Sequence, residues 1–265
     1  MSSDYLTPTS TCIGIYIPDS IVEIREYAFQ RCDALTDIKI PDSVKTIGTG
    51  AFSGCYSLEH IELGNGLTDI GGSTFALCSS LQDIELPNSV VNMAISAFNY
   101  CYNLSTLRIP SSVLSIDSDN VFNNQFSGQR IEVAAGNPNY CSIDGILYNK
   151  SKTEIICVPA YIQGTITIPE SVTSISEYAF GGRSNITGII LHKNTSISRY
   201  AFNACDELNT IYFYGNEAEF DAMSIDYEGN EAILAADLYF YSPTTPATSG
   251  NYWHYDTDGK TPVVW

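Results

Sequence analysis

The chain has 265 residues, and its 12 Lys and Arg residues against 30 Asp and Glu residues give a formal net charge of −18 at pH 7. Affinity for nucleic acid comes mainly from clustered basic side chains, so a chain with few and scattered ones is not expected to bind nucleic acid or anionic membranes. No apolar run reaches the roughly 18 residues that a membrane-spanning helix needs, which argues against membrane insertion.

The opening stretch "MSSDYLTPTS" lacks the charged start and the apolar segment of a signal peptide. Two interpretations follow: the protein is cytoplasmic, or its leader is absent from the chain as given. We favour the second, because a repeated pattern is already under way just after this opening.

An aromatic residue, a cysteine and a leucine recur along the first half of the chain at a constant interval of 23 residues. The three series are Phe29, Phe52, Phe75 and Phe98; Cys32, Cys55, Cys78 and Cys101; and Leu35, Leu58, Leu81 and Leu104. A unit of this size cannot enclose a core alone, so its apolar side chains must be covered by the units on either side. The sequence therefore predicts a solenoid of stacked repeats.

Each unit is expected to contain a strand, a corner and a short turn. Ile38 and Ile40 alternate with polar neighbours, which is the signature of a strand with one buried face. Pro41 has no amide hydrogen and ends that strand at a corner. A second apolar pair follows, and the Ala-Phe segment at Phe52 is predicted to form a single helical or 3-10 turn. Stacking such coils places their strands in a parallel sheet.

The second half keeps the pattern with changes. The unit at Phe122 is one residue longer, and an insert at 136–164, "GNPNYCSIDGILYNKSKTEIICVPAYIQG", predicts a β-hairpin around Asp144-Gly145. Repeats resume up to the strand that ends at Phe213. We therefore divide the chain into repeats at 1–213 and a capping segment at 214–265, because the end of a solenoid would otherwise expose its core.

The Leu-x-x-Ile-x-Ile pattern at Leu35, joined to "IPDSV", "IG" and "AFSGC", resembles the BspA-type leucine-rich repeat from about Ile13 to Phe213. The resemblance implies a leucine-rich-repeat horseshoe with a parallel β-sheet on its concave face, short 3-10 or helical turns on the other side, one inserted β-hairpin and a C-terminal cap. Three positions depart from the repeat: Gly64 replaces the strand-ending Pro, and Gln125 and Arg183 replace Cys.

The same resemblance implies a non-enzymatic, secreted or cell-surface bacterial protein that binds other proteins. The name-giving members are adhesins for host matrix and plasma proteins such as fibronectin and fibrinogen, so the implied partner is a protein of that kind. No motif specifies the ligand or the oligomeric state. The alternative is a structural spacer in a larger surface protein, with no ligand of its own.

The strand alternation predicts which side chains point away from the core and could contact a partner. The candidates for a partner-binding strand face are Tyr16, Lys39, His60, Glu62, Asp83, Glu85, Arg108, Glu132, Thr167, Ile190 and Tyr212. Also expected to point outward are Asp37, Thr106, Arg130 and Thr165. The acidic stretch around Glu62 and Glu85 would steer a basic partner. The alternative is that these charges only keep the sheet face soluble.

The sequence nominates no catalytic, cofactor or metal site. The three histidines, His60, His192 and His254, stand in no catalytic motif, and His60 is predicted to be a solvated surface residue. The segment "DTDG" at 256–259 lacks the remaining ligands of a calcium loop, so we expect a tight turn there.

The recurring cysteines and the C-terminal aromatic residues have structural interpretations as well. Unpaired cysteine behaves as a small buried hydrophobe, so Cys32, Cys55, Cys78, Cys101 and Cys205 are predicted to be buried and reduced. The aromatic residues Tyr252, Trp253, Tyr255 and Trp265 are either an anchor cluster for a partner or packing of the cap, and we favour packing.

Overall fold

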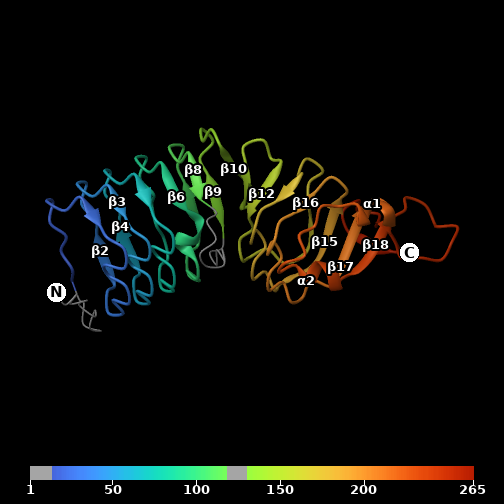
Figure 1. Ribbon diagram of the computed structural model, residues 1–265, viewed down its shortest axis with the longest axis horizontal. Coiled ribbons are helices and arrows are strands. Elements are labelled where there is room, and N and C mark those ends of the chain that lie inside the picture. Colours follow the sequence, from blue (N-terminus) through green and yellow to red (C-terminus); the bar gives the residue numbers. More distant parts are fainter. Residues whose placement is uncertain (1–13, 118–129) are drawn as a thin grey trace. The chain divides into compact units, whose positions relative to one another are not determined.

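The computed structural model describes residues 14–117 and 130–265, which form two compact units (Figure 1). Unit 1 comprises the chain up to residue 150 together with 159–161, and unit 2 comprises 151–158 and 162–265. The positions Ile13, Phe122 and Gln125, which entered the expected repeat pattern, lie outside the described residues.

Unit 1 contains two rows of short parallel strands, because each coil contributes one strand to a row. The first row holds β1 (Glu23–Ile24), β3 (Thr46–Ile47), β5 (Asp69–Ile70), β6 (Asn92–Ala94) and β8 (Ser115–Asp117). The second row holds β2 (Asp37–Lys39), β4 (His60–Glu62), β7 (Leu107–Ile109) and β9 (Ile131–Val133). In the second row β2 pairs with β4 and β7 with β9, so these are the strands that the alternation predicted. The solenoid with parallel sheets is confirmed.

The insert begins with the predicted hairpin. Strands β10 (Tyr140–Ile143) and β11 (Ile146–Asn149) pair in antiparallel register around the turn at Asp144-Gly145. Both turn residues have positive φ, 48° at Asp144 and 78° at Gly145, as a tight two-residue hairpin turn requires. The hydroxyl of Tyr161 donates to the carbonyl oxygen of Asp144 and holds this turn within unit 1.

Unit 2 also has two rows, and its second row extends past the last recognisable repeat. The first row holds β12 (Glu154–Cys157), β14 (Ser174–Ile175) and β16 (Ser196–Ile197). The second row holds β13 (Gly164–Thr167), β15 (Ile186–His192), β17 (Thr210–Tyr214), β18 (Asp237–Tyr241), β19 (Tyr252–Tyr255) and β20 (Pro262–Val264). Strands β18 and β19 continue the parallel order, and β20 closes the row in antiparallel pairing.

Helical structure is short wherever it is described. The Ala-Phe segment at Phe52 forms turns without helix, whereas the equivalent segment two coils later is the 3-10 turn η1 (Ile95–Phe98). In the capping segment α1 (Glu217–Asp221) and α2 (Glu231–Ala235) lie between β17 and β18. Asn216 begins α1 with a capping box, in which its side chain accepts from the Glu219 amide and the Glu219 side chain accepts from the Asn216 amide.

The core of unit 1 is a ladder of phenylalanine rings with a cysteine beside each step. Phe29, Phe52, Phe75 and Phe98 stack with successive ring centroids 5.1, 5.7 and 5.6 Å apart. The thiol of Cys78 donates to the carbonyl oxygen of Phe52 in the preceding coil over 3.2 Å. Cys55 and Cys101 bond in the same way to the carbonyls of Phe29 and Phe75. The cysteine is therefore a small buried side chain that also satisfies a backbone carbonyl at the coil corner.

Two departures from the repeat pattern have direct structural reasons. At Gly64 a Cβ atom would lie 2.5 Å from the backbone of Pro41, so the close approach of neighbouring coils excludes any side chain. At the cysteine position, Arg183 is 4% exposed and its Nε donates to the carbonyl oxygen of Val158 over 2.6 Å. Arginine thus takes over the donor role of the thiol.

The buried thiols give a first testable prediction. Burial raises the pKa of Cys101 to about 12 and the pKa of Cys205 to about 11, and it raises the pKa of Cys78 well above its usual value. Because the thiolate is the reactive form, these groups are expected to resist a thiol reagent in the folded protein at pH 8. The partly exposed Cys141 serves as the reactive internal control.

Unfolding in denaturant without reductant should release at least five reactive thiols, from Cys32, Cys55, Cys78, Cys101 and Cys205. The burial of these five side chains is confirmed by the structure, whereas their reduced state stays a prediction. Fewer than five titratable groups in the unfolded protein would show that some of them are oxidised.

Candidate binding surface

The strand face of unit 1 carries the predicted outward side chains. Ile38 and Ile61 are buried, and the residues on either side of each point to solvent. The register pairs Asp37 with His60 and Lys39 with Glu62, so outward side chains of adjacent coils stand side by side. Of the predicted candidates in this unit, those described as exposed are Tyr16, Lys39, His60, Glu62, Asp83, Glu85 and Arg108, and Glu132 is half-buried.

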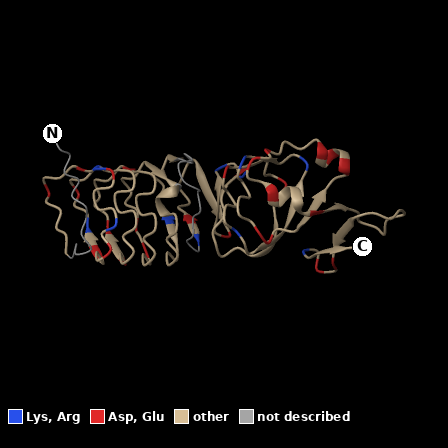
Figure 2. Cartoon of the chain, turned by 60° about the horizontal axis from the view of Figure 1, so that its bottom comes forward, with Lys and Arg blue, Asp and Glu red and all other residues tan. Residues whose placement is uncertain are grey.

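Contacts between oppositely charged or polar side chains connect the strands of this face. Lys39 Nζ lies 2.5 Å from Glu62 Oε1, and this hydrogen bond raises the pKa of Lys39. His60 Nδ1 lies 3.5 Å from Asp83 Oδ1, and the exposed His60 side chain agrees with the predicted surface position. Basic side chains are few along the chain (Figure 2). Exposed pairs of this kind contribute little stability, and they leave the charges available to a partner.

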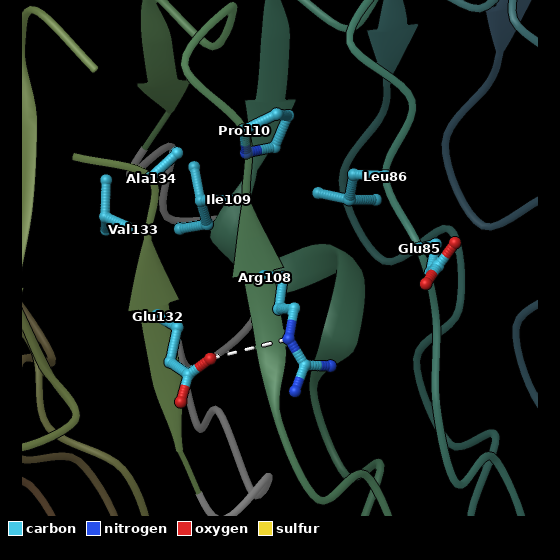
Figure 3. Close-up of a pocket in the computed structure, with 8 residues that line it drawn as sticks. All are labelled: Glu85, Leu86, Arg108, Ile109, Pro110, Glu132, Val133 and Ala134. Carbon is cyan, nitrogen blue, oxygen red and sulfur yellow. Dashed lines mark ion pairs between the residues drawn. The ribbon is translucent and has the colours of Figure 1, made fainter. Parts of the chain in front are cut away.

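A hollow of about 330 Å³ opens on the strand face where β7 and β9 end (Figure 3). Its lining consists of Glu85, Leu86, Arg108, Ile109, Pro110, Glu132, Val133 and Ala134. The five apolar residues lie together, and the three charged residues lie to one side of them. A concave apolar patch with a few fixed polar groups is the usual form of a specific binding site.

The charges beside the hollow are held in place by two contacts to one carboxylate. Arg108 Nε lies 3.4 Å from Glu132 Oε2, and Arg130 Nε lies 3.2 Å from Glu132 Oε1. Glu85 pairs with Arg108 through a single parallel bridge of the backbone. The sequence predicted the three charged residues of the hollow. It did not predict the hollow itself: Leu86 and Ile109 are buried, as strand alternation implies, whereas Val133 is half-buried and Ala134 is exposed.

Three predicted candidates belong to unit 2, and one of them is wrong. Thr167 is exposed and Tyr212 is half-buried, as an outward position allows. Ile190 was expected to point to solvent, but only 1% of its surface is exposed. It pairs with Thr167 on one side and Tyr212 on the other. The Tyr212 ring lies close to Gly188, which is on the same strand β15 as Ile190, and is 3.4 Å from where a Cβ of Gly188 would be.

An aromatic surface occupies the outward positions of β17, β18 and β19. It consists of Tyr212, Tyr214, Tyr239, Tyr241, Trp253 and Tyr255. The register pairs Tyr212 with Tyr239 and Tyr241 with Trp253, which places all these rings on one face of the sheet. Tyr212 was predicted as a site residue, and Trp253 and Tyr255 were considered as part of a possible anchor cluster, with packing favoured. The signal for the others was the alternation of tyrosine with core residues in "IYFY" and "DLYFY".

Trp253 is the base of the aromatic surface. Its side chain is fully buried, and its Nε1 donates to the carbonyl oxygen of Phe213 over 3.2 Å. The rings of Tyr214, Tyr241 and Tyr255 lie edge-on at centroid distances of 5.0, 5.0 and 5.1 Å. Trp253 therefore packs, whereas the tyrosines around it stay partly exposed. Outside this cluster, Trp265 is 45% exposed and lies against the His254 ring.

The DTDG segment forms the expected turn. Asp258 accepts hydrogen bonds from the backbone amides of Lys260 and Thr261, and together with the Thr261 hydroxyl these lower the pKa of Asp258 to about 2. Within 14–117 and 130–265, no group of three or more His, Cys, Asp or Glu side chains is arranged to hold a metal ion. Over the same residues, no helix is long and apolar enough to cross a membrane.

Stacked coils with parallel strand rows and short turns define a leucine-rich-repeat solenoid. The profile of the BspA type leucine-rich repeat region matches six copies within residues 6–127 and 160–228, and the chain belongs to this family. A search of curated protein sequences gives no significant match.

Among solved structures, the chain is similar to a leucine-rich repeat protein from Eubacterium ventriosum, at 24% identity and a TM-score of 0.59. That alignment covers 75% of this chain and 61% of the Eubacterium chain, so this chain spans less than two thirds of it. It is also similar to the pneumococcal vaccine antigen PcpA, at 18% identity and a TM-score of 0.56, over 84% of this chain and 80% of the other. At these identities the likeness concerns the fold.

Proposed function

We propose that this chain is a non-enzymatic protein-binding module, secreted or displayed on the cell surface, that engages its partner with the strand face of unit 1. The observation that carries the proposal is the hollow on that face, where an apolar floor lies beside Glu85, Arg108 and Glu132. Interfaces combine such a desolvated apolar centre with a charged rim that orients the partner. Membership of the BspA-type family and the likeness to bacterial repeat proteins support this class of function.

The proposed partner is a host matrix or plasma protein, as the family resemblance implies. Ala134 is the residue to change, because it is exposed and lines the hollow. Ala134→Arg fills the apolar floor with a charged side chain, and we expect it to weaken binding to immobilised fibronectin or fibrinogen at least about tenfold. Glu85→Lys should mainly slow association and reduce its dependence on salt. Biolayer interferometry of the full chain measures both effects.

The matched control is Ala28→Arg, the same change at an exposed alanine of unit 1 that does not line the hollow. It should bind as the unchanged protein does. If neither matrix nor plasma proteins bind, or if Ala134→Arg binds as tightly as the control, the strand face is not the binding surface. That result would favour the structural spacer instead.

A further inference from the structure

The aromatic surface of unit 2 occupies strand positions that hold charged residues in unit 1. The outward residues of β2 and β4 are Asp37, Lys39, His60 and Glu62, whereas β17 and β18 carry tyrosines in the same alternation. The inward residues of these later strands contact each other: the ring of the fully buried Phe213 lies edge-on to the ring of the half-buried Phe240. Sealing the end of the solenoid therefore explains the inward side chains and Trp253, but not the outward tyrosines.

The tyrosines are fixed before any partner arrives. Trp253 holds their rings from below, and Tyr212 and Tyr239 stack at a centroid distance of 6.1 Å. Burial, assisted by a hydrogen bond with Tyr255, raises the pKa of Tyr214, so its hydroxyl stays protonated at neutral pH. Tyrosine offers a large amphipathic contact area at a low cost in conformational entropy, which makes a preordered cluster suited to binding.

The electrostatic surroundings favour a cation on this surface. Glu170 is exposed and lies three residues after the end of β13, the strand that pairs with the His192 strand β15. Asp237 points outward at the start of β18, and Asp256 follows Tyr255 at the end of β19. Burial lowers the pKa of His192, which stacks on Tyr214, so this histidine adds no positive charge at neutral pH.

Three of the five basic residues of unit 2 are buried or already paired with a carboxylate. The five are Lys152, Arg183, Lys193, Arg199 and Lys260. Arg183 is buried, Lys193 pairs with Glu219 over 2.7 Å, and Arg199 pairs with Glu177 over 3.1 Å. The faces of aromatic rings carry negative electrostatic potential, so rings and carboxylates act together on a positive ligand.

We propose that the aromatic surface is a second binding site, which takes an extended, arginine-rich peptide segment of a protein partner. The guanidinium group is planar, stacks on tyrosine rings and can donate at the same time to carboxylates and hydroxyls, which a lysine ammonium does less well. The proposal rests on the proposed function only in assuming a protein partner, since it uses residues of unit 2 alone.

The test uses the full chain and a fluorescein-labelled peptide of alternating arginine and glycine. Fluorescence anisotropy reports binding, and a lysine-glycine and a glutamate-glycine peptide are measured beside it. We expect the arginine peptide to bind more tightly than the lysine peptide, and the glutamate peptide not to bind. Salt should weaken the interaction, because part of it is between charges.

Matched substitutions test whether the tyrosine rings themselves bind the peptide. Tyr212→Leu combined with Tyr239→Leu keeps apolar bulk but removes two aromatic rings. This double variant should bind the arginine peptide about tenfold more weakly. Tyr212→Phe combined with Tyr239→Phe keeps the faces and should bind like the unchanged protein. Tyr56→Leu, at an exposed tyrosine of unit 1, is the surface control. Far-ultraviolet circular dichroism and thermal unfolding verify that each variant is folded.

The fluorescence of Trp253 reports whether the peptide binds at the aromatic surface. The chain has two tryptophans, so Trp265→Phe leaves Trp253 as the single indole emitter beneath the tyrosines. Titration with the arginine peptide should change Trp253 emission in step with anisotropy. Binding that the leucine variant retains, or that leaves Trp253 emission unchanged, overturns the proposal.

Two other ligands of the aromatic surface would give different results, and either result would overturn the proposal. A concentration-dependent dimer that the leucine variant abolishes, without peptide binding, would assign the surface to a second copy. Binding of a soluble neutral glucan with the same variant sensitivity, again without peptide binding, would assign it to carbohydrate. If the peptide binds as expected while Ala134→Arg leaves capture by immobilised matrix proteins unchanged, the proposed role of unit 1 fails and the aromatic site stands.

Discussion

Replacement of Phe75 by alanine is expected to lower the free energy of unfolding by about 3–5 kcal/mol, the usual effect of removing a fully buried aromatic side chain. Phe75 is completely buried and stacks on Phe52 and on Phe98. In a solenoid the stability of each coil depends on its contacts with the coils on both sides. One substitution in the middle of the ladder therefore weakens two interfaces at once. Urea denaturation followed by circular dichroism measures the loss.

Phe29 provides the matched control for this change. It stacks on Phe52 at 5.1 Å and keeps part of its surface exposed. Phe29→Ala is expected to lower the free energy of unfolding by about half as much, because less apolar area is removed from the interior. Equal losses at the two positions would mean that the ladder is not stabilised by contacts on both sides of each ring.

Replacement of Asn137 by alanine is expected to lower the free energy of unfolding by about 2–4 kcal/mol, since it leaves several buried polar groups without partners. The Asn137 Nδ2 donates to the carbonyl oxygens of Pro110 and Val113, at 3.0 and 2.9 Å. Its Oδ1 accepts from the amides of Asn139 and Tyr140, both at 2.9 Å. This fully buried side chain joins the start of the insert to the corner of the preceding coil.

Asn139→Ala is the control, because Asn139 is exposed and its side chain makes one hydrogen bond, to the carbonyl oxygen of Leu114. We expect Asn139→Ala to lower the free energy of unfolding by less than about 1 kcal/mol. At neutral pH, Asn137→Asp should lower the free energy of unfolding at least as much as Asn137→Ala, because a carboxylate would face two carbonyl oxygens. Similar losses for the alanine variants at 137 and 139 would show that the buried network is not the source of the effect.

The outward side chains show where sequence reasoning succeeded and where it did not. Strand alternation predicted Lys39, His60 and Glu62 on the exposed face, because alternation is a local property of an extended backbone. Whether Glu62 is a free acid or the partner of Lys39 depends on the register between coils. Ile190 was misplaced for a similar reason: it lies on a strand paired on both sides, and its exposure depends on the neighbouring strands rather than on alternation alone.

The hollow and the aromatic surface were also predicted only in part from the sequence. Glu85, Arg108 and Glu132 were nominated from the sequence, but the hollow beside them depends on how the chain at the ends of β7 and β9 places Pro110, Val133 and Ala134, which keep part of their surface exposed. The tyrosines of β18 were not nominated, because the interval of 23 residues ends before this strand, although the sheet itself continues. A repeat search detects spacing, whereas the sheet depends on backbone pairing that tolerates connections of other lengths.

By itself, the sequence determined the stacked-coil architecture, the strands, the hairpin at Asp144-Gly145 and the buried cysteines. These features follow from short-range patterns, such as alternation, turn residues and a constant interval, that each coil repeats. Only the tertiary structure decided the donor role of the cysteines, the pairing of the surface charges, the hollow and the tyrosines packed around Trp253. Those features depend on distances between side chains of different coils, which no pattern along a single coil contains.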